Sequence, residues 1–270
     1  MIINRSNIFE ILKEFGLRPE KDYGQNFLID DNASQRIVSF LNASKEDKVL
    51  EIGPGLGSLT HHLVLTQCDL SVVDVDPMMC EFIKFIYKEN AINVIENDIR
   101  KTDISEYNKI IGNLPYNITT ETISYLLLNF KKCQKFVLMC QEETFNHFND
   151  VSGKEYGPLS VLIHLLGNIK RLLTVKPSQF HPAPKCKSVV FEIDIDDNCD
   201  VEFVRNVYRF AKQMFSNRRK TIFNNLKSVL KDSSLCEEIL KESHIFIETR
   251  PEQISPSQYV NLYKIFKYKV

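Results

Sequence analysis

The chain has 270 residues, of which 43% are hydrophobic, and a formal net charge of −1 at pH 7; this suits one large domain plus a small one, or two domains. No stretch approaches the roughly 20 apolar residues of a transmembrane helix, and the N-terminus lacks the apolar core and cleavage site of a signal peptide. Seven scattered cysteines without a C-x-x-C pair argue against a zinc site and a disulfide framework, and for a reducing cytoplasm.

The first third of the chain predicts a strand, a glycine loop and a helix in succession. An apolar run at 49–52 reads as a buried strand, and glycines at 53, 55 and 57 follow it before a helix from about Ser58. Such a unit binds nucleotides, because glycines let the backbone approach a ligand. The next strand, 70–73, ends at Asp74, where a carboxylate can accept hydrogen bonds from ribose hydroxyls. To this point an NAD enzyme fits nearly as well.

Two further strands are expected to end in polar residues. The strand at 92–95 leads to Asp98, which could accept a hydrogen bond from an adenine amine or simply cap a helix. The strand at 107–112 leads to Asn-Leu-Pro-Tyr at 113–116, where the proline ends regular structure. The amide can accept hydrogen bonds from an exocyclic amine and the ring can stack on a base; the alternative is a structural turn.

The remaining pattern predicts the rest of an α/β fold. Helices are expected at 6–15, 33–42, 77–88, 119–130, 141–148 and 156–166, strands at 135–140, 169–175 and 188–195, and further helices at 201–215, 218–231, 235–242 and 256–267. A proline-rich loop at 177–184 is expected to present Phe180. We therefore predict a Rossmann-like sheet of about seven strands in a catalytic domain, 1–198, with an N-terminal lid, and a small all-helical domain, 199–270.

Basic residues cluster near the start of the second predicted domain. Between Phe203 and Lys231 there are eight lysines and arginines and no acidic residue. Such clustering indicates phosphate binding, although each cation alone could belong to a solvated helix face.

Several motifs occur in order along the chain and together resemble one family. They are Gly-Gln-Asn-Phe-Leu at 24–28, Glu-Ile-Gly-Pro-Gly at 51–55, Asn-Leu-Pro-Tyr-Asn at 113–117, Tyr-Gly-Pro-Leu-Ser at 156–160, the Pro-Ser-x-Phe-x-Pro-x-Pro-Lys loop at 177–185 and Arg-Arg-Lys-Thr at 218–221. Across roughly residues 20–260 the chain closely resembles the bacterial small-subunit ribosomal RNA adenine dimethyltransferases. The glycine spacing likewise looks like that of proteins that bind S-adenosylmethionine.

The resemblance implies transfer of methyl groups from S-adenosylmethionine to two adjacent adenosines near the 3′ end of small-subunit ribosomal RNA, by a cytoplasmic monomer acting late in subunit biogenesis. Implied cofactor contacts are Asn26, Leu28, Gly53, Asp74, Asp98 and Asn113. Implied RNA contacts are Arg218, Arg219 and Lys220. The family usually has Glu where Asp74 stands and Lys where Glu142 stands, and the consequence of both departures is open.

Methyl transfer to an adenine amine needs alignment more than a strong base. We expect the Asn113 side-chain oxygen and the Leu114 carbonyl to accept the two amine hydrogens, Tyr116 to stack on the base, and Phe180 to cover its other face or the rim. No metal or nucleophilic residue is required. The alternatives are a large-subunit adenine methyltransferase of the macrolide-resistance type and a noncatalytic RNA-binding assembly factor; an NAD dehydrogenase is disfavoured by the glycine spacing.

Overall fold

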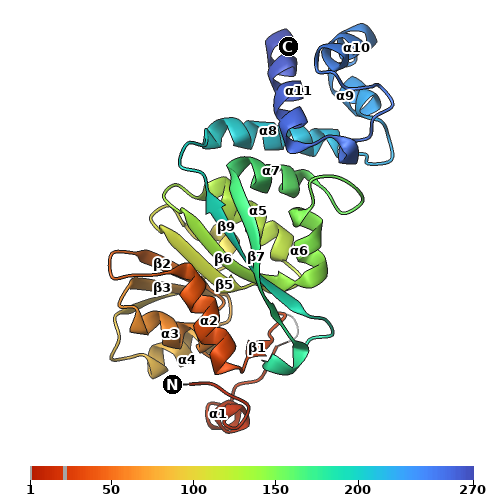
Figure 1. Cartoon of the computed structure of the whole chain (residues 1–270). Coiled ribbons are helices and arrows are strands. Elements are labelled where there is room, and N and C mark those ends of the chain that lie inside the picture. Colours follow the sequence, from red (N-terminus) through yellow and green to blue (C-terminus); the bar gives the residue numbers. More distant parts are fainter. Residues whose placement is uncertain (1, 21–22) are drawn as a thin grey trace. The chain divides into compact units, whose positions relative to one another are not determined.

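The computed structural model describes residues 2–20 and 23–270, and Figure 1 shows its elements. The chain divides into two compact units. The larger comprises Met1–Thr144 and Lys170–Ile195, and the smaller comprises Phe145–Ile169 and Asp196–Val270.

A seven-stranded sheet organises the larger unit, in the order β4-β3-β2-β5-β6-β9-β7. Its strands are β2 (Lys48–Ile52), β3 (Asp69–Asp74), β4 (Ile92–Glu96), β5 (Lys109–Asn113), β6 (Lys135–Gln141), β7 (Gly167–Val175) and β9 (Ser188–Ile195). Strands β2 to β6 run parallel, and β9 pairs antiparallel with β6. The prediction of an α/β fold with about seven strands is confirmed.

The strand order reverses direction between β2 and β5. From β2 the chain proceeds to β3 and β4 on one side, then returns to place β5 on the other side of β2. Ligands of open α/β sheets bind at the carboxyl ends of the strands at such a switch point. The segments that follow β2 and β5 are the glycine loop and the Asn-Leu-Pro-Tyr turn, so the topology brings the two motifs together.

Helices of this unit bury apolar side chains in its core. They are α1 (Ile8–Glu14), α2 (Asp31–Leu41), α3 (Ser58–Leu65), α4 (Pro77–Ile86), the 3₁₀ helix η1 (Ile99–Lys101), α5 (Thr119–Asn129) and the start of α6 (Glu142–Asn149). Buried Ile37, Leu63 and Ile83 join the strand residues in one core, as amphipathic periodicity requires. Among the described residues, no helix is long and apolar enough to cross a membrane.

A two-stranded pairing outside the main sheet was not expected from the sequence. Strand β1 (Phe27–Leu28) pairs antiparallel with β8 (Phe180–His181), so that Leu28 faces Phe180 in register. A 3₁₀ helix, η2 (Pro177–Gln179), precedes β8. The pairing fixes the N-terminal segment beside the sheet.

The smaller unit is helical and has its own core. Its elements are α7 (Pro158–Leu166), α8 (Val201–Met214), α9 (Ile222–Leu230), α10 (Ser233–Glu242), η3 (Pro251–Gln253) and α11 (Pro256–Lys269). Buried Tyr156 and Val161 belong to the same hydrophobic cluster as Val207, Leu226 and Tyr259. The expected boundary at 198 lies close to the break after Ile195, but residues 145–169 group with the helical unit because of this shared core.

Gly112 occupies a point on β5 at which no side chain fits. A Cβ built there would lie 2.7 Å from the Ile52 carbonyl oxygen and 2.8 Å from the Ile52 Cβ on β2. Both neighbours lie in the middle of the sheet and have little freedom to move. The close approach therefore requires glycine.

Gly112→Ala is expected to destabilise the protein by about 1–3 kcal/mol, because the methyl group must push β5 away from β2. Urea denaturation measures the change. Gly157→Ala is the matched control, since nothing lies within 4 Å of a Cβ there. Equal stability of the two variants would contradict the interpretation.

Candidate active site

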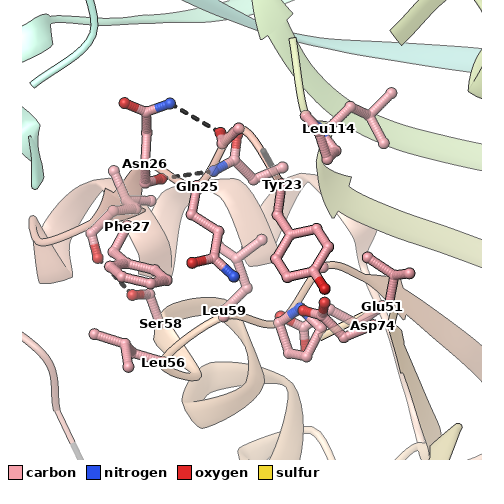
Figure 2. Close-up of a pocket in the computed structure, with 18 of the residues that line it drawn as sticks. Tyr23, Gln25, Asn26, Phe27, Glu51, Leu56, Ser58, Leu59, Asp74 and Leu114 are labelled. Carbon is pink, nitrogen blue, oxygen red and sulfur yellow. Dashed lines mark hydrogen bonds between the residues drawn. The ribbon is translucent and has the colours of Figure 1, made fainter. Parts of the chain in front are cut away.

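A cavity opens at the carboxyl ends of β2, β3 and β5, where ligands of open α/β sheets bind. Figure 2 shows side chains of the N-terminal segment and of the glycine loop entering it. The lining residues come from 23–28, 51–59, 74–75 and 113–116. A second hollow, lined by Asp98 and Arg100 among others, shares Tyr23, Gly53 and Asp74 with the first. The two hollows thus form adjoining parts of one site.

The glycine loop offers its main chain to the cavity. Gly53, Gly55 and Gly57 all have positive φ, between 52° and 85°. A Cβ on Gly55 would lie 3.0 Å from the Phe27 ring, and one on Gly53 would lie 3.4 Å from the Asn113 carbonyl oxygen. Glycine is needed here both for backbone conformation and for space.

Two acidic residues, buried Glu51 and half-buried Asp74, line the site. Burial raises the pKa of Glu51 to about 8, and the hydroxyl of Thr60 donates to its carboxyl group at 2.7 Å. Burial also raises the pKa of Asp74 to about 6, although a hydrogen bond from the Asp76 N–H, 2.9 Å long, opposes the shift. Glu51 is therefore largely protonated at neutral pH and can donate as well as accept a hydrogen bond.

Asp98 lies on the wall of the second hollow, in an ion pair with Arg100. The guanidinium group contacts both carboxylate oxygens, with Nη2 to Oδ2 at 2.6 Å and Nε to Oδ1 at 3.0 Å. Hydrogen bonding to Arg100 lowers the pKa of Asp98. The backbone N–H of Arg100 also donates to Asp98, so the carboxylate caps η1 as well. The two predicted roles of Asp98, contact with a ligand and capping of a helix, are therefore compatible with each other. Arg100 is an additional residue of the site that the sequence did not suggest.

Asn113 ends β5 and faces the N-terminal segment. Its side-chain Nδ2 donates to the Asn26 carbonyl oxygen at 3.2 Å. Only the amide nitrogen can donate, so Oδ1 is left as the acceptor of the group. The next residue, Leu114, is buried and donates its N–H to the Met139 carbonyl at 3.0 Å. The turn is therefore fixed to β6.

Tyr116 lines the cavity and is fixed at its hydroxyl end. The hydroxyl lies 2.8 Å from the Ser188 hydroxyl on β9, and burial raises the pKa of Tyr116. A ring fixed at its far end offers a rigid face to a flat ligand.

Phe180 does not lie where the sequence analysis expected it. Instead of projecting from a loop, it is 3% exposed, belongs to the core of the larger unit and pairs with Leu28 through β8. It does not line either hollow described above. The reason is the β1–β8 pairing, which turns the middle of the proline-rich segment inward.

The N-terminal segment contributes more residues to the site than the two, Asn26 and Leu28, implied by the resemblance. Tyr23, Gln25 and Phe27 line the cavity together with the expected Asn26 and Leu28. The Ser58 hydroxyl donates to the Leu28 carbonyl, which ties the segment to α3. The only sequence signal for these extra residues was the polar, glycine-containing run that carries them.

The unusual Glu142 has a partner of its own. It forms an ion pair with Arg171 on β7. An acidic residue at this position therefore meets a basic one within the same unit. Where the family usually has a lysine, this chain therefore has a carboxylate that is paired in a salt bridge within the larger unit.

The three basic residues at 218–220 differ in their surroundings. Arg218 donates to the carbonyl oxygens of Lys154 and Tyr156 at 2.7 Å and 3.0 Å, and its guanidinium lies 5.9 Å from the centre of the Phe215 ring. All three residues are exposed. Arg218 differs from its two neighbours because its guanidinium group is bonded to the segment at 153–156.

Comparison with known proteins identifies related sequences over almost the whole chain. A model of the ribosomal RNA adenine dimethylase family matches residues 16–268. Ribosomal RNA small subunit methyltransferase A of Malacoplasma penetrans is 35% identical over 269 residues, which cover 97% of each protein. The protein of the same name from Leuconostoc mesenteroides is 33% identical, with 97% of this chain and 95% of the relative covered.

Solved structures share the fold. A dimethyladenosine transferase from Plasmodium falciparum has a TM-score of 0.77 at 22% identity, with 90% of this chain and 98% of that chain covered. The 23S rRNA methyltransferase ErmE has a TM-score of 0.68 at 19% identity and covers 90% of this chain and all of its own. At these identities the likeness concerns the fold.

Glu51→Gln is expected to make stability less dependent on pH. Because the folded protein keeps the Glu51 proton up to about pH 8 while the unfolded chain loses it near pH 4.5, the free energy of unfolding falls as pH rises between these values, by at most about 1.4 kcal/mol per pH unit. Glutamine removes this contribution. Urea denaturation of the free protein from pH 5 to 8 measures it, with Glu46→Gln as control; a slope identical to that of the wild type would contradict the assignment.

Proposed function

Because the chain belongs to the ribosomal RNA adenine dimethylase family, we propose that it dimethylates the 6-amino groups of two adjacent adenosines near the 3′ end of small-subunit ribosomal RNA. Membership of the family makes the chain an S-adenosylmethionine-dependent rRNA adenine dimethyltransferase. The finer proposal adds that the enzyme acts as a monomer on an immature small subunit, late in its biogenesis. The observation that carries the proposed adenine methylation is the position of the Asn-Leu-Pro-Tyr turn, which lies beside the glycine loop at the edge of one cavity.

The residues present fit S-adenosylmethionine. The positive-φ glycines leave room beside the loop, and acidic Asp74 and Asp98 stand in the two adjoining hollows. Asp74 would accept hydrogen bonds from the ribose, and Asp98, held by Arg100, would accept one from the adenine amine. Asn26 and Leu28 would contact the cofactor from the N-terminal segment, Gly53 from the loop and Asn113 from the turn.

The task of the protein in this reaction is to align the adenine amine with the methyl group. When bound, the cofactor would supply a methyl group activated by a sulfonium: the adenine nitrogen would bond to the methyl carbon, the carbon–sulfur bond would break, and sulfur would keep the electron pair. In our proposal, Asn113 Oδ1 and the Leu114 carbonyl accept the two amine hydrogens and aim the nitrogen lone pair at the methyl group. Water can take the proton that leaves the amine afterwards.

Tyr116 would stack on the target base. The Ser188 hydroxyl holds the far end of its ring, so the face would be in place before the base arrives. The target must leave its helix or lie in a splayed loop to reach this face. Phe180 is buried, so we assign it to support of the Leu28 strand instead of contact with the base.

Arg219 and Lys220 would contact RNA phosphates. Both are exposed and belong to the stretch between Phe203 and Lys231 that lacks acidic residues. Arg218 was expected to share this role, but its guanidinium group already serves the carbonyls of Lys154 and Tyr156. We therefore propose a phosphate contact for two of the three residues and a supporting role for the first.

The function is tested by treating undermethylated small subunits and, in parallel, large-subunit RNA with the protein and labelled S-adenosylmethionine, then locating the methyl groups by mass spectrometry of each RNA. Asn113→Ala should keep its fold and most of its RNA affinity but lose roughly 10²–10³-fold in single-turnover rate. Tyr116→Ala should also weaken capture of the base, by about 1–3 kcal/mol, and Tyr116→Phe should retain more activity than Tyr116→Ala.

Label in large-subunit RNA only, or no label at all with the wild type, would overturn the proposed function in favour of the macrolide-resistance type or of a noncatalytic assembly factor. Near-normal turnover by Asn113→Ala would show instead that the reacting amine lies elsewhere.

Changing Arg219 and Lys220 together to Ala should weaken RNA binding. It should also flatten the plot of log affinity against log salt concentration by roughly 1–2 units of slope, because a protein with fewer phosphate contacts releases fewer counterions. Arg218→Ala should mainly lower the melting temperature. RNA affinity at several salt concentrations distinguishes them, and exposed Lys131 and Lys132, both changed to Ala, serve as control. An unchanged slope in the Arg219–Lys220 variant would show that these cations are only solvated.

A further inference from the structure

Gln25 lies beside the site without a role in the chemistry described so far, yet both ends of its amide are bound. Its Nε2 donates to Asp76 Oδ2 at 2.7 Å, and its Oε1 accepts the N–H of Glu20 at 2.8 Å. Asp76 is 4% exposed, and its other oxygen accepts the Met78 N–H at 2.9 Å and so caps α4. Gln25 therefore joins the N-terminal segment to a helix that is fixed on the sheet.

The residue after Gln25 contacts the Asn113 amide directly. The carbonyl of Asn26 accepts the hydrogen bond from Asn113 Nδ2, and the Asn26 side chain in turn donates to the Gly24 carbonyl at 3.0 Å. Gly24 has little room, since a Cβ there would lie 3.2 Å from Asn117 Oδ1 in the same turn. The N-terminal segment and the turn are thus fitted against each other.

We propose that Gln25 is a positioning residue that, through the Asn26 carbonyl, sets the orientation of the Asn113 amide. An amide side chain can rotate to exchange its oxygen and nitrogen, and only one orientation aims Oδ1 at an incoming amine. The Asn26 carbonyl selects that orientation because it can bind only the nitrogen. The Gln25–Asp76 bond holds the carbonyl in place, and its charge-assisted character makes it one of the stronger hydrogen bonds of its kind.

This inference rests on the proposed role of Asn113 and adds a link between closure of the N-terminal segment and readiness for transfer. A cofactor enclosed by the segment would meet an amide that is already oriented. An open segment would leave the amide free to rotate. Transfer would then be slow even with cofactor bound.

The test compares Gln25→Ala with Gln179→Ala. Gln179 makes the same pair of bonds, from the Lys176 N–H to Oε1 and from Nε2 to Asp30, each 2.8 Å long, and does not line the cavity. Gln25→Ala should slow single-turnover transfer roughly 10–100-fold at saturating S-adenosylmethionine, as expected for a misplaced group. Gln179→Ala should stay near the wild-type rate. Full recovery of Gln25→Ala at saturating cofactor would overturn the proposal, because it would mean that Gln25 serves binding alone.

Two further measurements separate this proposal from the proposed function. In an Asn113→Ala background, Gln25→Ala should cost less than about twofold more, since there is no amide left to orient; a fully additive loss would overturn the link. In the free protein, the side-chain amide resonance of Asn113 in a ¹H–¹⁵N spectrum, assigned by its loss in Asn113→Ala, should shift in Gln25→Ala and stay in place in Gln179→Ala. An unmoved resonance in Gln25→Ala would overturn the orientation role whether or not the protein methylates RNA.

Discussion

The approach of β5 to β2 is the constraint on which the site depends. Gly112 lets the two backbones meet so closely that a Cβ would lie 2.7 Å from the Ile52 carbonyl oxygen. One residue further along each strand, the chain enters the glycine loop and the Asn-Leu-Pro-Tyr turn. A wider gap would separate Gly53 from Asn113, whose carbonyl oxygen now stands 3.4 Å from the position of a Gly53 Cβ. The spacing of β2 and β5 in the sheet therefore sets the spacing of Gly53 and Asn113 in the site.

Burial of acidic groups gives the cavity its electrostatic character. Glu51 and Asp74 both have pKa values raised by burial, whereas the Arg100 guanidinium lowers the pKa of Asp98. One site thus holds carboxyl groups in different protonation states at neutral pH. A protonated Glu51 adds no negative charge to a region of low dielectric, which limits its cost to folding. The charge that remains lies where hydroxyls and amines of a nucleoside can reach it.

The parts of the site that depend on local pattern were predictable, and those that depend on distant pairing were not. The glycine loop and the Asn113 turn follow predicted strands directly, so their place at the carboxyl edge followed from sheet topology. The inward position of Phe180 depends on pairing with Leu28, and the support that Arg218 gives depends on the segment at 153–156. Neither partner is near in sequence, and no periodicity marks it. The same holds for residues 145–169, of which Tyr156 and Val161 belong to the core of the helical unit.

The pairing of β1 with β8 also has a consequence for the order in which the protein is made. Gln179 and Asp30, which bond beside this pairing, are 149 positions apart, and β9, which pairs with β6, is the last strand to be synthesised. A chain that emerges from its N-terminus can form β2 to β6 early, together with the bonds of the N-terminal segment to Ser58, Asp76 and Asn113, but β1 has no strand partner until β8 has followed. The last contacts of the N-terminal segment therefore form only when nearly all of the larger unit has been translated. A chain truncated before β8 would contain the glycine loop and the turn but would lack the strand that pairs with β1.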